Sequence, residues 1–202
     1  MKQFNNYDEA KKSADAAGSE RLPAGAYVCK VKQVRYEQGK DGASDRIVLA
    51  FDIAEGDFQD FFNKQFEANT NEDKKWKGRV NIFVPKDDGS EKDAITKKSF
   101  AGWCSAFEKS NDGYKWDWDE NKWVGKLIGI VFGETGTVID GKEIVYTEAR
   151  FAIEVAKVRN GTAPIAKFKE KNGYKGSGSG NGSASGDSEF MKFSGGKEEL
   201  PF

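Results

Sequence analysis

Alternating apolar and polar side chains predict three strands in the first half of the chain. Residues 27–36 have the period of two that is typical of a half-buried strand, with Tyr27, Cys29 and Val31 set against Lys30 and Lys32. After a glycine-containing turn, residues 47–53 carry an apolar row formed by Ile47, Leu49, Phe51 and Ile53. The same alternation predicts a third strand over residues 75–84, which Pro85 ends.

A helix and two further strands are predicted in the second half. Apolar residues recur with helical spacing between residues 95 and 109, at Phe100, Trp103, Cys104 and Phe107. Residues 127–132 and 144–157 follow as two strands, and the Asp140-Gly141 pair between them is a strong hairpin signal. The aromatic-rich residues 57–73 fit either a short helix or an irregular loop.

The order of these elements favours a mainly β fold. Three strands, a helix and two strands are expected of a five-stranded OB-type barrel, whose capping helix lies between strands 3 and 4. Other small α+β folds share the order. The expected organisation is a lead-in at residues 1–22, the OB-type domain at 23–170, a flexible Gly/Ser-rich linker at 171–196 and a terminal tip at 197–202. This C-terminal tail is expected to be disordered, because it contains too few apolar residues to offset its ordering entropy.

The composition argues against several classes of enzyme. The 202 residues include no histidine, which removes Ser-His-Asp and Cys-His catalysis and imidazole proton transfer. We therefore expect a protein that is not an enzyme and has no cofactor or metal. The two cysteines lack metal-ligand spacing and are expected to be buried hydrophobes. No segment resembles a signal peptide or a membrane span, so we expect a cytoplasmic protein without a membrane partner.

Basic residues interleave with aromatic residues on the first and third predicted strands. Cations track the phosphates of single-stranded DNA, and aromatic rings stack on its bases for roughly 1–3 kcal/mol per base. We predict a DNA-binding surface made by Lys30, Lys32, Arg35, Tyr36, Lys75, Trp76, Lys77, Arg79 and Phe83. Tyr36, Trp76 and Phe83 are the candidates for stacking. The alternative is a solvated strand face with core aromatics, and Trp76 lies on the apolar side of its strand.

The chain ends in a short acidic and apolar motif. It consists of Glu198, Glu199, Leu200, Pro201 and Phe202. A terminal Phe can fill a partner's pocket while basic residues bind the carboxylates. The motif resembles the acidic tip of bacterial single-stranded DNA-binding proteins, although Lys197 and only two acids depart from the usual denser acidic run.

The body of the chain resembles a phage family. Residues 22–29, 51–56 and 113–120 are similar to replication-module proteins of phages that infect Gram-positive bacteria. The resemblance implies a single-stranded DNA-binding protein that coats and protects DNA during phage replication and recombination in the host cytoplasm. It also implies that the tip recruits a helicase, primase or polymerase.

Other functions stay open at the level of sequence. A strand-annealing recombination mediator would bind the same ligand and speed duplex formation. A metal-dependent nuclease would need carboxylates converging on Mg²⁺, which no spacing here demands. A carbohydrate-binding or structural phage protein would share the barrel. A homo-oligomer also stays open.

Overall fold

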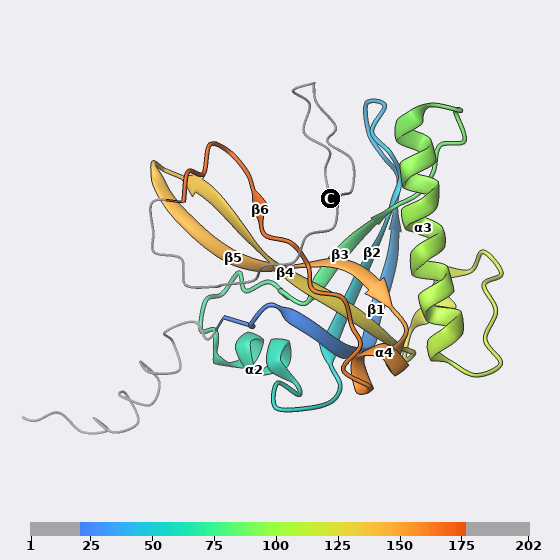
Figure 1. Cartoon of the computed structure of the whole chain (residues 1–202), viewed down its shortest axis with the longest axis horizontal. Coiled ribbons are helices and arrows are strands. Elements are labelled where there is room, and N and C mark those ends of the chain that lie inside the picture. Colours follow the sequence, from blue (N-terminus) through green and yellow to red (C-terminus); the bar gives the residue numbers. More distant parts are fainter. Residues whose placement is uncertain (1–20, 177–202) are drawn as a thin grey trace, which may run out of the picture.

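A six-stranded sheet organises residues 21–176, the part of the chain that this computed structural model describes (Figure 1). The strand order is β3-β2-β1-β4-β5 with antiparallel pairing, and β6 pairs in parallel with β4. The strands are β1 (Gly25–Glu37), β2 (Arg46–Ile53), β3 (Arg79–Phe83), β4 (Leu127–Ile139), β5 (Lys142–Ile153) and β6 (Lys169–Glu170). Residues 1–20 of the predicted lead-in, residues 177–196 of the predicted linker and the tip at 197–202 lie outside the described residues.

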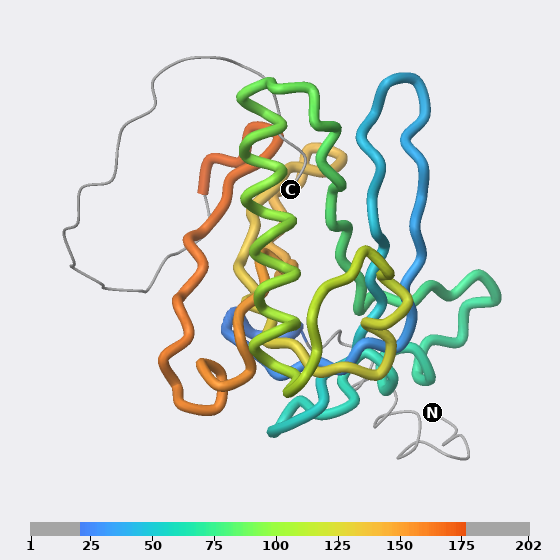
Figure 2. Tube along the Cα trace, turned by 90° about the vertical axis from the view of Figure 1, so that its right-hand side faces the viewer, coloured from blue at the N-terminus to red at the C-terminus, as the bar shows by residue number. Residues whose placement is uncertain are grey.

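The helices lie at the ends and sides of this sheet. The longest, α3 (Glu91–Ser110), follows β3 and packs against β3, β4 and β5 (Figure 2). The others are α2 (Phe61–Ala68), the 3₁₀ helix η1 (Glu120–Trp123) and α4 (Val155–Arg159). No ladder joins β3 to β5 within residues 21–176, so the sheet is open there and α3 lies beside the opening. The mainly β prediction is confirmed.

Alternation along the strands builds the core. Directly paired residues share a face, and the pairs Val34–Leu49 and Ile47–Ile82 are buried on the inner one. The α3 stripe Phe100, Trp103, Cys104 and Phe107 is buried as predicted. Both cysteines are free and buried, and burial raises their pKa values, that of Cys104 to about 12. The prediction that they act as small hydrophobes is therefore confirmed.

Several predicted boundaries are corrected. The helix begins at Glu91 instead of near residue 95, because the Ser90 hydroxyl accepts the Asp93 N–H (3.1 Å) and caps it before the apolar stripe starts. The last predicted strand ends at Ile153, and residues 155–159 form α4. The ambiguous aromatic segment contains α2. Asp140 and Gly141 form the predicted hairpin turn, both with positive φ (49° and 73°).

The third strand is also shorter than predicted, starting at Arg79 instead of residue 75. If β3 began earlier, a backbone N–H of that strand would donate to the Phe51 carbonyl. Instead, this carbonyl accepts the indole N–H of Trp76 (3.1 Å). Lys75, Trp76 and Lys77 therefore lie in an irregular segment before β3. No helix in the described range is long and apolar enough to cross a bilayer.

Candidate nucleic-acid interface

The outer face of β1, β2 and β3 carries three rows of paired residues. One row is Gln33–Ala50–Arg79, the next is Arg35–Val48–Asn81, and the last is Glu37–Arg46–Phe83. Because direct partners point to the same side of a sheet, these nine side chains form one continuous surface. We call this surface the outer face.

A groove of about 270 Å³ lies on the outer face and is here named the sheet groove. Val48 and Ala50 of β2, the central one of these three strands, have short side chains, so the longer side chains around them project further from the sheet. The lining contains three cations and no carboxylate, and consists of Gln33, Arg35, Val48, Ala50, Lys75, Trp76 and Arg79. The groove therefore combines a cationic rim with one large aromatic ring.

The indole N–H of Trp76 holds its ring in place. Its indole N–H donates to the carbonyls of Phe51 (3.1 Å) and Gly78 (3.0 Å), and its ring centroid lies 5.8 Å from that of Phe66. The ring is half-buried and still reaches the groove. A ring fixed in this way loses little side-chain entropy when a second ring stacks on it.

Gly78 allows this arrangement. A Cβ atom at this position would lie 2.4 Å from the Phe51 carbonyl oxygen and 2.7 Å from the Phe62 ring. Only glycine lets the segment approach β2 closely enough for the Phe51 N–H to donate to the Gly78 carbonyl (2.8 Å). The position of Trp76 therefore depends on Gly78.

The cations near the groove differ in how far their charges are compensated. Within residues 21–176, the side chains of Lys75, Lys77 and Arg79 form no ion pair or hydrogen bond. Arg35 and Arg46 both pair with Glu37, the single carboxylate on the outer face. Hydrogen bonding from Arg46, helped by Arg35, lowers the pKa of Glu37, so this carboxylate is charged at neutral pH. Counting Lys75 and Lys77, the outer face and its border carry five cations and one carboxylate.

The structure brings together four of the nine predicted DNA-binding residues. Arg35, Lys75, Trp76 and Arg79 line the sheet groove, and Lys77 is an exposed neighbour of the same segment. Phe83 shares the outer face but lies in the third row and lines a different cavity. Gln33, Val48, Ala50 and Asn81 were missed, because small or neutral polar residues carry no chemical signal in a sequence.

Three predicted residues lie elsewhere. Tyr36 pairs directly with the buried Ile47, so it shares the inner side of the sheet and not the face of Arg35. Its hydroxyl donates to Asp45, and this hydrogen bond raises the pKa of Tyr36. Lys32 is the extra residue at a β-bulge between Val31 and Gln33. Lys30 lies opposite Asp52 in the β1–β2 ladder and does not line the groove.

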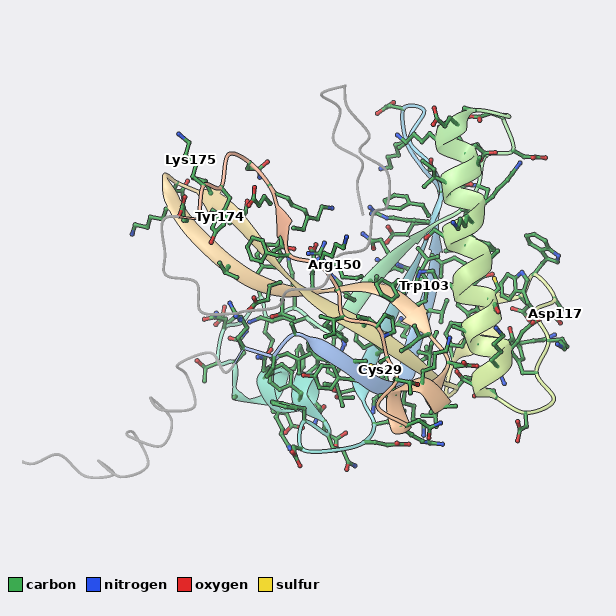
Figure 3. All side chains as sticks on the ribbon, in the orientation of Figure 1. Cys29, Trp103, Asp117, Arg150, Tyr174 and Lys175 are labelled. Carbon is green, nitrogen blue, oxygen red and sulfur yellow. The ribbon has the colours of Figure 1, made fainter. Side chains whose placement is uncertain are left out.

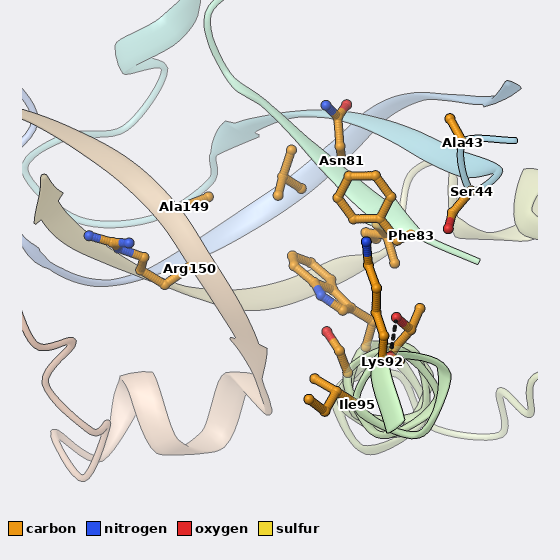
Figure 4. Close-up of a pocket in the computed structure, with 13 residues that line it drawn as sticks. Ala43, Ser44, Asn81, Phe83, Lys92, Ile95, Ala149 and Arg150 are labelled. Carbon is orange, nitrogen blue, oxygen red and sulfur yellow. Dashed lines mark hydrogen bonds between the residues drawn. The ribbon is translucent and has the colours of Figure 1, made fainter. Parts of the chain in front are cut away.

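A second cavity, of about 220 Å³, lies between β3, α3, β5 and the connection from β1 to β2 (Figure 4). Phe83 and Asn81 reach it from β3, Lys92 and Ile95 from α3, and Ala149 from β5. We call it the α3 pocket. It and the sheet groove are lined by side chains of the same strand, β3.

The far side of α3 carries an exposed tryptophan beside charges of both signs. Trp103 lies on the sheet side of the helix, whereas Asp117 lies on the other side (Figure 3). There Trp118 is 78% exposed and stacks on Phe100, with Asp117 and Asp119 as its chain neighbours. In the described part of the chain, no three His, Cys, Asp or Glu side chains converge to hold a metal ion.

No family model matches the sequence, and no curated protein matches it either. A function is therefore proposed below from the residues of the site.

Proposed function

We propose that this protein binds single-stranded DNA on the outer face of β1, β2 and β3, with little sequence preference. The sheet groove carries the proposal, since it sets a fixed indole ring among three cations with no carboxylate. A single strand matches both features, because it offers a phosphate track to cations and unstacked bases to rings. A duplex keeps its bases stacked and gives Trp76 no partner.

The fold supports this proposal. The order of strands and the placement of α3 between β3 and β4 agree with an OB-type barrel that is open between β3 and β5. In OB folds the face of strands 2 and 3 binds oligonucleotides. The sheet groove includes residues of β2 and β3, which is the corresponding surface.

The tip adds a proposal that rests on sequence alone. Glu198–Phe202 would bind a replication or recombination protein through the terminal Phe side chain and the carboxylates. Coating DNA on the sheet and recruiting a partner through the tip would combine into a role in replication and recombination.

Tryptophan fluorescence during titration with oligo(dT) tests the proposed site. We expect quenching by the single strand and none by a matched duplex. Trp76→Ala should weaken binding by the stacking energy of one base, roughly 1–3 kcal/mol. Trp118→Ala is the matched control, because it removes an exposed tryptophan that does not line the sheet groove. Melting temperatures of both variants separate a lost contact from a lost fold.

Two outcomes would count against this site. Equal affinity of the Trp76 and Trp118 variants would remove the groove from the binding surface. Quenching by duplex as strong as by oligo(dT) would show that the protein binds phosphates without stacking on bases.

A further inference from the structure

The walls of the α3 pocket are mostly apolar and suit a flat ring. Val80, Ile82, Ile95, Trp103 and Ala149 line it, with Ser99 and Thr96 at its α3 side. Its volume of about 220 Å³ exceeds that of the apolar cavities of about 150 Å³ that accept benzene in other proteins. Since it opens where β3 and β5 are not paired, a ligand can enter without breaking a ladder.

Trp103 lines the pocket with a hydrogen-bond donor that has no protein acceptor in the described range. Trp103 is only 4% exposed, yet its indole N–H donates to no group within residues 21–176. The indole nitrogens of Trp116 and Trp123 are fully enclosed and have no acceptor among the described residues. The indole nitrogen of Trp103 is not enclosed in this way, so it stays accessible. Because the atom is accessible, a ligand acceptor can replace the water to which this N–H would otherwise donate.

The two terminal nitrogens of the Arg150 guanidinium, by contrast, are already occupied, while its Nε has no partner among the described residues but is fully enclosed. The guanidinium pairs with Glu148 (3.0 Å) and donates to the Glu134 carbonyl (2.8 Å) and the Thr135 hydroxyl (2.6 Å). Lys92 is the exposed cation at the pocket, and it has no ion-pair partner in the described range. A phosphate beside the pocket would therefore meet Lys92.

The α3 pocket lies at the β3 edge of the outer face, where side chains from both sides of β3 line it. Arg79, Asn81 and Phe83 alternate along β3 and point to the same side, with Arg79 in the sheet groove and the other two at the α3 pocket. A strand bound in the groove and following β3 would reach the pocket at its next bases. Asn81 follows Arg79 on this side of β3, is exposed, and carries an amide that can donate and accept.

We propose that the α3 pocket accepts one extruded nucleobase of the bound strand, and that it favours thymine. The inference rests on the proposed function and adds base preference to it. Thymine offers carbonyl oxygens to the Trp103 N–H and a C5 methyl group to the apolar walls. Adenine has no carbonyl oxygen, and cytosine would bring an amino donor into the same space.

Filling the pocket from an exposed helix position tests the proposal. Ser99 lines the pocket and is exposed, so Ser99→Trp should occupy the cavity without a buried change. Ala101→Trp is the matched control, because Ala101 is also small, neutral, exposed and on α3 but does not line the pocket. The full-length variants are titrated with oligo(dT) and oligo(dA) of equal length. The Ala101 variant sets the baseline, because oligo(dA) also stacks on itself.

We expect Ala101→Trp to keep the wild-type preference for oligo(dT). Ser99→Trp should reduce that preference by roughly threefold to tenfold, the range of one net hydrogen bond. Trp103→Phe, checked by its melting temperature, should reduce it similarly by removing the N–H while keeping a ring.

The outcomes separate this inference from the proposed function. If the Ser99 and Ala101 variants share one affinity and one preference while Trp76→Ala binds weakly, the pocket inference is wrong and the groove proposal stands. If the wild-type chain binds neither oligonucleotide, the proposed function itself is wrong.

Discussion

Glu37 is the residue that limits the positive charge of the outer face. It accepts from Arg46 Nε (2.8 Å) and also pairs with Arg35, so one carboxylate compensates two arginines. Arg35 lines the sheet groove, and its charge is therefore shared between a protein carboxylate and any bound phosphate. Exposed pairs of this kind contribute little to stability, which leaves Glu37 free to change without loss of the fold.

Removal of the Glu37 charge should strengthen DNA binding. We expect Glu37→Gln to raise affinity for oligo(dT) by roughly twofold to fivefold, the scale of one exposed ion pair. Glu154→Gln is the control, since Glu154 pairs with Lys157 beside α4 and away from the outer face. Fluorescence titration at low salt measures both. An unchanged or weaker affinity of the Glu37 variant would contradict phosphate binding at Arg35.

Elements, more than single residues, set the geometry of the groove. The segment before β3 lies against β2 through Gly78, and the β1–β2 connection is closed by hydrogen bonds to Asp45. Each contact fixes the end of a strand on which groove residues lie. Neither Gly78 nor Asp45 lines the groove itself.

Gly78 and Gly102 are present for different reasons: Gly78 permits close packing of two segments, whereas Gly102 is only a poor helix former within α3. Gly78→Ala should destabilise the protein by about 1–3 kcal/mol through overpacking against Phe51 and Phe62, and should weaken DNA binding by displacing Trp76. Gly102 lies within α3, where an added Cβ atom would meet nothing within 4 Å. Gly102→Ala should therefore stabilise by roughly 0.5–1 kcal/mol and leave binding unchanged. Urea unfolding and oligo(dT) titration check the pair, and equal effects would refute this distinction.

The β1–β2 connection should weaken in acid. Hydrogen bonds from Tyr36 and from the Gly39 N–H (2.8 Å) lower the pKa of Asp45 in the folded protein. The unfolded chain has an Asp pKa of about 3.9, so this stabilisation is complete above that pH and is lost as pH falls through the lower folded value. The stability difference between wild type and Asp45→Ala should be constant near neutrality and shrink below about pH 4.

Denaturant unfolding at several pH values measures this difference. Asp57→Ala is a suitable control, because Asp57 is exposed and makes no hydrogen bond or ion pair within residues 21–176. A gap between wild type and Asp45→Ala that grows in acid would reverse the predicted sign.

At the scale of the whole molecule, the local distribution of charge matters more than net charge. The chain carries a formal charge of only −1. The outer face and the adjoining Lys75 and Lys77 nevertheless hold five cations against the single carboxylate of Glu37, whereas the loop after α3 carries charges of both signs, among them the Asp117–Lys122 pair. Such a local excess of positive charge attracts a polyanion even when the net charge is near zero.

Salt dependence should report the number of groove cations. If Arg35, Lys75 and Arg79 each neutralise one phosphate of a single strand, log K against log salt should have a slope of about −2. The double variant Lys75→Ala/Arg79→Ala should reduce its magnitude to about 0.7. Titrations with oligo(dT) over a range of NaCl concentrations give the slopes. A wild-type slope near zero would leave no role for these cations.

The sequence predicted much of the local structure. Periods of two and of 3.6 marked the first two strands, the α3 stripe and both strands of the final hairpin, although their ends moved. Periodicity shows which side of an element is buried, but it does not show where the element ends. It therefore could not predict a boundary set by a helix cap, or by a side chain that replaces a backbone hydrogen bond. The shortened β3 is such a case, since the Trp76 indole takes the Phe51 carbonyl.

The candidate site was predicted only in part. Arg79 and Trp76 were found because basic and aromatic residues are conspicuous in a sequence. Tyr36 was grouped with Arg35, although neighbours in a strand point to opposite sides, and the structure places it beside Ile47. Lys32 was lost to a bulge, which depends on pairing with β2.

By itself, then, the sequence determined five of the six strands in the described range, the long helix, the hairpin turn and the buried side of the first strands. These depend on local spacing and on the conformational preferences of residues such as Asp140 and Gly141. Only the tertiary structure decided that Gln33, Ala50 and Arg79 form one row and that Phe83 meets α3 across an unpaired edge. Register and packing bring together residues far apart in the chain, and no local pattern of side chains records such contacts.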